Sequence, residues 1–168
     1  YKYNMTIILK NKHSLKIDNF KFKCCVGKKG IDKEKTEGDK KTPRGIFGLE
    51  KLYYRNDRIK KPFTKLKCIK ITKNMGWCNN VKDKINYNQL INTKKKTRHE
   101  KLYRRDFKYD LVIPIKYNWK KRVPGKGSCI FLHLTKNYKP TEGCIALSKK
   151  DFLIMLKLIN TKTKIKIC

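Results

Sequence analysis

The apolar residues of this chain come mostly in short runs of strand length, separated by polar loops. Residues 5–17 carry alternating or β-branched apolar side chains on both sides of a polar turn, which predicts a hairpin. The segment FKFKCCV (20–26) continues with a period of two and stops at Gly27. Further strands are expected within IFGLEKLYYR, LKCIKIT, YDLVIPIKYN, SCIFLHL and the tail KTKIKIC. We therefore expect a mainly β sandwich or barrel, built by residues 1–168 as one domain.

One or two helices are expected beside these strands. After Ser148, which is a good N-cap, one apolar stripe has helical spacing: Phe152, Leu153, Leu156 and Ile159. A second helix is expected within Lys94–Arg105, inside the otherwise irregular stretch 73–108. No run of 18 or more apolar residues occurs, so the sequence predicts no membrane-spanning helix. Because the chain starts at Tyr1, we interpret it as a mature form or a fragment without a leader.

The charge of the chain is strongly positive, with 45 Lys and Arg against 13 Asp and Glu, a net charge of +32. Such an excess attracts anionic polymers and anionic surfaces. The basic residues are spread along the whole chain and are mostly lysine, whereas arginine is the better reader of bases and phosphates. We therefore expect no specific nucleic-acid partner, although a basic protein that binds anionic polymers remains an alternative.

The seven cysteines are an odd number, so at least one thiol is free or pairs between chains. Cys68 and Cys78 lie ten residues apart, a spacing that permits a disulfide. The sequence has no C-x-x-C, no H-E-x-x-H, no phosphate-loop order of residues and no dinucleotide fingerprint. We therefore expect neither a metal nor a cofactor.

His133 and Cys144 are the candidate pair for chemistry. A histidine in an apolar strand is more often a core residue, and a lone cysteine more often a small buried hydrophobe. However, Gly143 opens space beside the sulfur, and the loop 135–142 can return the chain so that the imidazole reaches the thiol. An imidazole in hydrogen-bond reach takes the thiol proton and leaves a thiolate–imidazolium pair. The other two histidines, His13 and His99, are expected to be solvated.

The order of these motifs resembles the L,D-transpeptidase catalytic domain family of the YkuD type, in its compact single-domain subgroup. The resemblance is carried by Thr42-Pro43-Arg44-Gly45, then His133, then Thr141-Glu142-Gly143-Cys144. The segments GWCNN, YN at 87–88 and YDLVIPIKYN also match, so the likeness runs from about Val26 to Leu158. Two positions depart from many members: Glu142 replaces histidine before the Gly-Cys pair, and Ala146 replaces arginine or asparagine.

The resemblance implies a mostly β fold and a cysteine acyltransferase of the cell envelope or periplasm that acts on peptidoglycan stem peptides. Cys144 would attack the carbonyl of the third stem residue and release D-alanine, and an amine would then take the acyl group from the thioester. Water in place of the amine would give an L,D-carboxypeptidase or endopeptidase. His133 would be the general base, and the backbone N–H groups of Glu142, Gly143 and Cys144 are candidates to stabilise the oxyanion.

Several further residues are candidates to line or support the site. Arg55, Arg58 and Arg104 can each hold a substrate carboxylate through two N–H groups. Trp77 is a candidate to border the groove, and Asn118, with Ser128, to support the histidine strand. The Thr-Pro-Arg-Gly turn itself is expected to be structural, because proline fixes φ and glycine permits a tight backbone.

Overall fold

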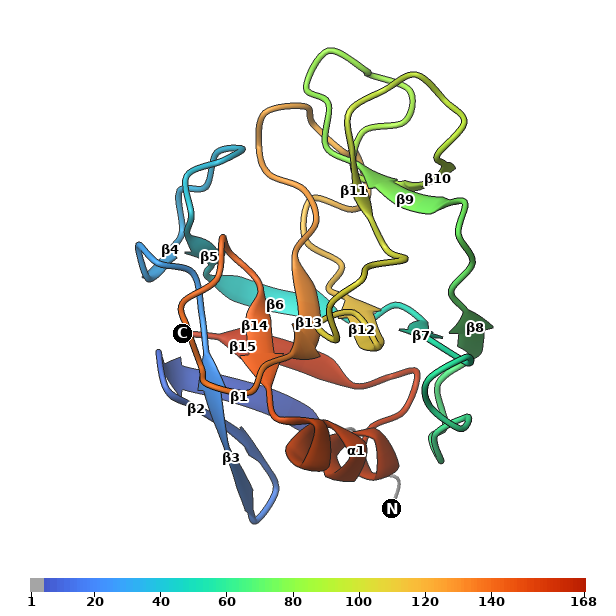
Figure 1. Cartoon of the computed structure of the whole chain (residues 1–168). Coiled ribbons are helices and arrows are strands. Elements are labelled where there is room, and N and C mark those ends of the chain that lie inside the picture. Colours follow the sequence, from blue (N-terminus) through green and yellow to red (C-terminus); the bar gives the residue numbers. More distant parts are fainter. Residues whose placement is uncertain (1–4) are drawn as a thin grey trace.

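A computed structural model describes residues 5–168 and contains one large, curled sheet (Figure 1). Its ten strands stand in the spatial order β6 (Gly45–Gly48), β15 (Lys164–Ile167), β1 (Thr6–Asn11), β2 (Ser14–Ile17), β3 (Phe20–Cys25), β14 (Ile145–Leu147), β13 (Phe131–Leu134), β12 (Leu111–Pro114), β7 (Leu52–Tyr54) and β8 (Cys68–Lys70). Two small sheets accompany it: β10 (Leu90–Asn92), β9 (Met75–Cys78) and β11 (His99–Lys101), and β4 (Ile31–Asp32) with β5 (Thr42–Pro43). The mainly β class expected from the short apolar runs is confirmed.

The large sheet curls until its first strand returns to its eighth. An isolated antiparallel bridge joins Leu49, just after β6, to Ile115, just after β12. Two backbone hydrogen bonds flank this bridge, from Glu50 N to Pro114 O and from Lys116 N to Gly48 O, both 2.9 Å. The region from β6 to β12 therefore has the closed topology of a barrel, and β7 and β8 extend it at one end.

The only helix among the described residues is α1 (Lys149–Leu158), which begins at the N-cap expected from the sequence. The Ser148 hydroxyl accepts a hydrogen bond from the Asp151 N–H (3.2 Å), which satisfies one of the free donors of the first turn. Phe152, Met155 and Leu156 on its inner face are fully buried in the main core. Helix α1 thus covers the core beside β14 and β13 (Figure 1).

The second helix expected within Lys94–Arg105 is absent from the structure, and that prediction is wrong. Its first residues form turns, and His99, Glu100 and Lys101 instead pair with β9 as strand β11. The reason is that the segment has no apolar stripe with helical spacing, and Leu102 is its one buried apolar side chain.

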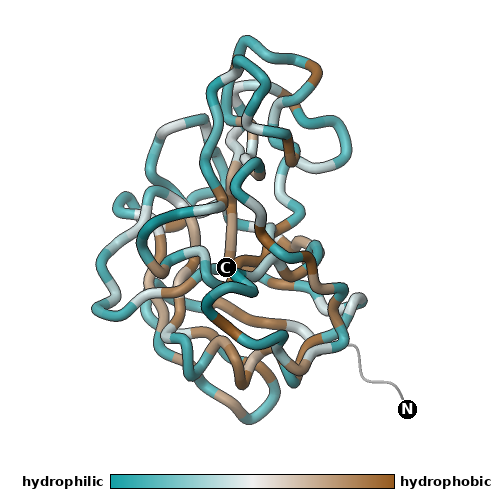
Figure 2. Tube along the Cα trace, turned by 45° about the vertical axis from the view of Figure 1, so that its right-hand side comes forward, coloured by the Kyte–Doolittle hydropathy of each residue, from teal (hydrophilic) through white to brown (hydrophobic). Residues whose placement is uncertain are grey.

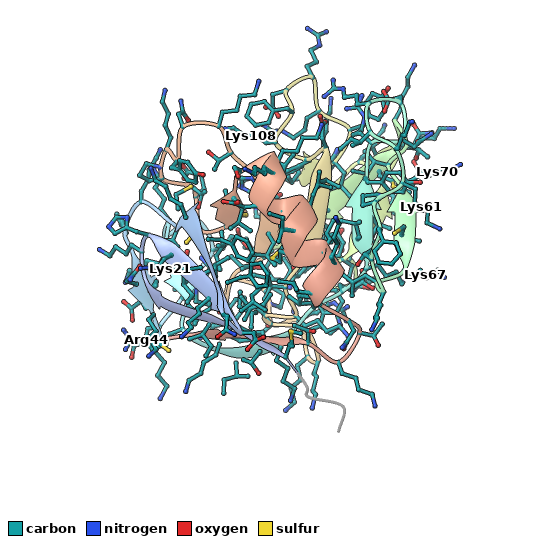
Figure 3. All side chains as sticks on the ribbon, turned by 90° about the horizontal axis from the view of Figure 1, so that it is seen from below. Lys21, Arg44, Lys61, Lys67, Lys70 and Lys108 are labelled. Carbon is teal, nitrogen blue, oxygen red and sulfur yellow. The ribbon has the colours of Figure 1, made fainter. Side chains whose placement is uncertain are left out.

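The hydrophobic residues lie inside, and the loops of the β9 region are largely hydrophilic (Figure 2). A second, smaller core under β9 and β11 contains Tyr53, Trp77, Tyr109 and Phe131. No helix in the described part of the chain is long and apolar enough to cross a membrane. Viewed from below, the labelled basic side chains lie around the molecule rather than along one stripe (Figure 3): Lys21, Arg44, Lys61, Lys67, Lys70 and Lys108.

Candidate active site

His133 and Cys144 lie on one face of two neighbouring strands. Strands β13 and β14 are parallel, with His133 opposite Ala146. Because side chains alternate along a strand, Cys144, two positions before Ala146, points to the same side as His133. The side chains on the opposite face of the two strands pack into the main core: Leu132, Leu134, Ile145 and Leu147. The sheet therefore separates the candidate pair from the main core and places both side chains on its other side, with His133 within β13 and Cys144 just before β14.

The Cys144 sulfur is held by two backbone groups. It accepts a hydrogen bond from the Phe131 N–H (3.4 Å) and donates one to the carbonyl of Cys129 (3.2 Å). Burial raises the pKa of Cys144 to about 12, although the Phe131 N–H favours the thiolate and works against that rise. The resting side chain is thus a neutral thiol.

The His133 ring is fixed by its own strand. Nδ1 lies 2.9 Å from the Leu134 carbonyl oxygen, which can only accept, so Nδ1 carries the proton and Nε2 has a free lone pair. The Tyr109 ring packs edge-on, with ring centroids 5.4 Å apart. Burial lowers the pKa of His133 to about 4. At neutral pH the pair is therefore a neutral thiol and a neutral imidazole, not the resting thiolate–imidazolium pair expected from the sequence, and the proton must move during the reaction.

Both side chains line one groove with a volume of about 900 Å³. Its apolar walls include Phe107, Ile130 and Pro140. The basic side chains along it are Lys28, Lys35, Arg98, Arg104, Lys108, Lys136 and Lys139, and the acidic ones are Glu37, Glu100 and Glu142. A groove of this size and mainly positive charge can hold an extended peptide that carries carboxylates.

The turn before the cysteine has no room for a side chain at residue 143. Gly143 has φ +142°, and a Cβ there would lie 2.9 Å from the Lys41 carbonyl oxygen. The Thr141 hydroxyl accepts from the Gly143 N–H (3.1 Å) and donates to the Cys144 carbonyl (2.5 Å). Because the Gly143 N–H is already engaged, the Cys144 N–H is the better candidate of the two for an oxyanion donor. Glu142 is exposed and bound to Lys28 (2.8 Å), which lowers the pKa of its carboxyl.

The Thr-Pro-Arg-Gly turn supports the cysteine turn directly. The Thr42 hydroxyl, fully buried, donates to the Gly143 carbonyl (2.8 Å) and accepts from the Gly27 N–H (2.9 Å). Gly45 has φ +146° and packs against the Phe47 ring, which lies 2.7 Å from where a Cβ would stand. Thr42 thus ties its own turn to Gly143, which lies 101 residues later and directly precedes the cysteine.

The structure corrects the placing of two candidate arginines. Arg55 is buried, binds Asp57 through two N–H groups (both 2.8 Å) and stacks on Tyr103. Arg58 donates its N–H groups to Asp110 and to backbone carbonyls. Neither arginine lines the groove. Arg104 does line it, although it also binds Glu100 and Asp106.

Trp77 and Asn118 also lie outside the groove. Trp77 is buried in the smaller core, and its Nε1–H donates to Asn88 (2.9 Å). Asn118 closes its own loop through bonds to both Val123 backbone groups and to the Gly127 carbonyl. The residue that supports the start of the histidine strand is instead Asn88. Its Oδ1 accepts from Trp77 and from the Cys129 N–H (3.3 Å).

Several groove residues carry no local signal in the sequence that would mark them as part of a site. Arg98, Glu100 and Lys108 are ordinary charges in a polar stretch of the sequence. Glu100 and the neighbouring Arg98 reach the groove through the pairing of β11 with β9, and Lys108 reaches it beside β13, where its carbonyl accepts from the Leu134 N–H (3.0 Å). His99, expected to be solvated, is half-buried, with Nδ1 2.8 Å from the Thr97 carbonyl. In the sequence, Asn88 stood out only as part of the Tyr-Asn pair at 87–88. In the structure its φ is +55°, a backbone conformation that favours asparagine.

The cysteines in the described residues are free thiols, and Cys68 and Cys78 are not paired. Within residues 5–168, no group of three or more His, Cys, Asp or Glu side chains gathers in a way that would hold a metal ion.

The chain matches the family profile described as "YkuD: L,D-transpeptidase catalytic domain" over residues 3–167. A search of curated proteins gave no match.

Several solved structures are similar to this chain at low sequence identity, two of them with a TM-score above 0.5. Bd1075 of Bdellovibrio bacteriovorus is 16% identical, with a TM-score of 0.52, over 98% of this chain and 48% of that one. The helical cell shape determining protein Pgp2 of Campylobacter jejuni is 16% identical, with a TM-score of 0.51, over 97% and 46% of the two chains. An L,D-transpeptidase from Mycobacterium smegmatis is 14% identical, with a TM-score of 0.42, over 98% and 58%. This chain thus spans about half the length of the first two structures that it matches.

Proposed function

Because the chain belongs to the L,D-transpeptidase catalytic domain (YkuD) family, we propose that it transfers an acyl group from a peptidoglycan stem tetrapeptide to an amine through Cys144. Its family consists of cysteine-dependent enzymes that modify peptidoglycan. One observation carries the proposal: His133 and Cys144 stand on the same face of two paired strands and line the same groove.

The first half of the reaction forms a thioester. His133 Nε2 takes the proton of the Cys144 thiol as the sulfur attacks the carbonyl of the third stem residue. The resulting imidazolium remains oriented by the Leu134 carbonyl, which accepts from Nδ1. The oxyanion of the tetrahedral intermediate accepts a hydrogen bond from the Cys144 N–H. His133 then gives its proton to the nitrogen of D-alanine, the carbon–nitrogen bond breaks, and D-alanine leaves.

The second half consumes the thioester. An amine from a neighbouring stem peptide attacks the thioester carbonyl, and His133 takes one amine proton. The carbon–sulfur bond then breaks, the proton returns to the sulfur, and a new amide links the two stems. Since pKa values of about 4 and about 12 keep both groups neutral at rest, the imidazole is ready to accept a proton without first losing one.

The groove suits the charge of such a substrate. Stem peptides carry free carboxylates, and basic side chains on the wall outnumber acidic ones. Lys136 and Lys139 follow β13 in the chain, and the Lys108 carbonyl accepts from the Leu134 N–H at its end (3.0 Å), so these lysines can hold carboxylates beside the pair. This substrate places the protein in the cell envelope, where the same basic surface would also attract anionic polymers.

Product analysis tests the proposal. The protein is incubated with a disaccharide stem tetrapeptide ending in D-alanine, and the products are separated and weighed by mass spectrometry. We expect cross-linked dimers, free D-alanine, and, after rapid acid quenching, a covalent acyl adduct on the peptide that contains Cys144. Cys144→Ala and His133→Gln should abolish all three, whereas Cys168→Ala, which removes the exposed terminal thiol, should leave them unchanged.

The outcomes separate the alternatives. Tripeptide without dimers would reassign the protein as an L,D-carboxypeptidase that uses the same pair. Cross-linking that persists in Cys144→Ala, or an adduct on Cys129 instead, would refute the assignment of the nucleophile. Salt-sensitive binding to anionic polymers with no turnover would favour a basic binding protein.

A further inference from the structure

Lys35 is a buried lysine that lines the groove beside the candidate nucleophile. The residue is 6% exposed, although lysine is among the side chains least often buried. Its ammonium is anchored by Asp39, with Nζ 2.7 Å from Oδ1. The Asp39 carboxylate also accepts from the backbone N–H groups of Thr36 (2.8 Å) and Lys41 (2.9 Å), so it is fixed before the lysine meets it.

The Lys35 side chain runs between two glycines that come from distant loops. A Cβ at Gly127 would lie 3.0 Å from Lys35 Cε and 3.3 Å from Cγ, and a Cβ at Gly143 would lie 3.7 Å from Nζ. Both glycines have positive φ, +106° and +142°. The ammonium is therefore guided to the turn that carries Cys144.

The hydrogen bonds of Nζ within the described residues leave one of its protons without an acceptor. Of its three N–H groups, one binds Asp39 and another makes a long contact with the Thr36 carbonyl (3.4 Å). The third has no acceptor among the described residues, and Lys35 is one of the residues that line the groove. Arg104, the other cation near the sulfur, donates N–H groups to Asp106 and Glu100.

We propose that Lys35 is a positioning residue for the acyl-transfer reaction: its buried ammonium, delivered between Gly127 and Gly143 by Asp39, stabilises the negative charge that develops at Cys144. This role deepens the proposed function and rests on it for the kinetic arm of the test. The thiol arm depends only on the chemistry of the sulfur.

The charged and titratable groups around Cys144 define what Lys35 must offset. Glu100 on β11 disfavours the thiolate, while Lys35 and Arg104 favour it. His133 on β13 and Tyr109 are both neutral. Burial lowers the pKa of His133 and raises the pKa of Tyr109 well above its usual value. Removing Lys35 therefore leaves Arg104 as the one basic neighbour opposed to Glu100.

The experiment measures how the alkylation rate of Cys144 by iodoacetamide depends on pH, followed on the Cys144 peptide by mass spectrometry. Lys35→Met should shift the profile upward by about one pKa unit, which is about a tenfold slower reaction at pH 8. Lys35→Arg, which keeps the charge, should recover most of the rate. Lys41→Gln is the matched control, because it removes one positive charge from the same loop and should leave the profile in place.

A second variant separates this effect from loss of folding. Lys35→Met leaves the Asp39 carboxylate without its cation. The double variant Lys35→Met/Asp39→Asn removes both charges, so no unpaired buried anion remains. The double variant should melt closer to the parent protein and still show the slower thiol. If both variants lower the melting temperature but leave the alkylation profile unmoved, Lys35 is merely structural and the proposal is overturned.

Turnover then distinguishes the two proposals. With active parent protein, Lys35→Met should lower kcat about tenfold or more while KM changes little. A shifted thiol profile in a protein that makes no cross-links would uphold the role of Lys35 at the sulfur and reject the transpeptidase assignment. Unchanged kcat in Lys35→Met would refute the kinetic role, whatever the activity of the parent.

Discussion

Replacing Thr42 by valine should be among the most damaging small changes in this protein. Valine has nearly the same shape as threonine but lacks the hydroxyl that joins the Gly27 N–H to the Gly143 carbonyl. Thr42 is 0% exposed, so water cannot replace the lost partner without a rearrangement. Thr42→Val therefore leaves one buried donor and one buried acceptor without their bonds.

The magnitude follows from these two groups. A buried polar group left without a partner costs about 1–3 kcal/mol, so the two together should lower the free energy of unfolding by about 2–4 kcal/mol after some local relaxation. In a chain of this size, each kcal/mol lowers the melting temperature by about 2–4 °C, so a fall of about 4–16 °C is expected. Thr42→Ser keeps the hydroxyl and loses one methyl group, which should cost about 1 kcal/mol.

Denaturant and thermal unfolding of the two variants provide the assay. Thr42→Val should be the less stable by at least about 1 kcal/mol, and its turnover should fall further than its stability at the assay temperature explains, because the Gly143 turn is no longer held. Equal stability of Thr42→Val and Thr42→Ser would show that the hydroxyl bridge contributes nothing, and the role given to this turn would fall.

Three further outcomes follow from the site. Burial holds the pKa of His133 near 4 against about 6.5 in an unfolded chain, so the folded protein binds fewer protons in this window and loses stability as the pH falls through it. In His133→Gln, the loss of unfolding free energy between pH 7 and pH 4.5 should be about 2–3 kcal/mol smaller than in the parent, and equal losses would count against a buried neutral imidazole. Gly143→Ala should lower the melting temperature and slow turnover, because the new Cβ meets the Lys41 carbonyl at a strained φ, and full activity would contradict that. Asn88→Ala should cost about 2–4 kcal/mol in denaturant unfolding through its lost bonds to Trp77 and Cys129, whereas a change under about 0.5 kcal/mol would refute its bridging role.

The sequence predicted those elements whose signal is local. The hairpin of β1 and β2, strand β3 and helix α1 all follow from the spacing of apolar residues and from the Ser148 cap. The segment IFGLEKLYYR was expected as one strand, yet it divides into β6 and β7, which lie near opposite ends of the sheet order. Which strand pairs with which is decided by packing over the whole chain, and no window of ten residues contains that information.

The same limit applied to the site. Period two in the histidine strand indicated which way His133 points, but the facing of Cys144 depends on the register of β13 with β14. The arginines show the limit most clearly. The groups that occupy Arg58 lie 46–52 residues away, at Arg104, Arg105, Asp106 and Asp110, so the sequence could not reveal that its N–H groups are already used.

The joining of β13 to β14 has a consequence for redesign. The distance between His133 and Cys144 depends mainly on the spacing of the hydrogen-bonded strands β13 and β14. That spacing varies little, whatever side chains the rest of the molecule carries. The groove walls belong to other parts of the chain, among them the segment that holds Lys108 and the loop that holds Lys136. Directed evolution of those walls can therefore alter which peptide enters while the reacting atoms keep their alignment.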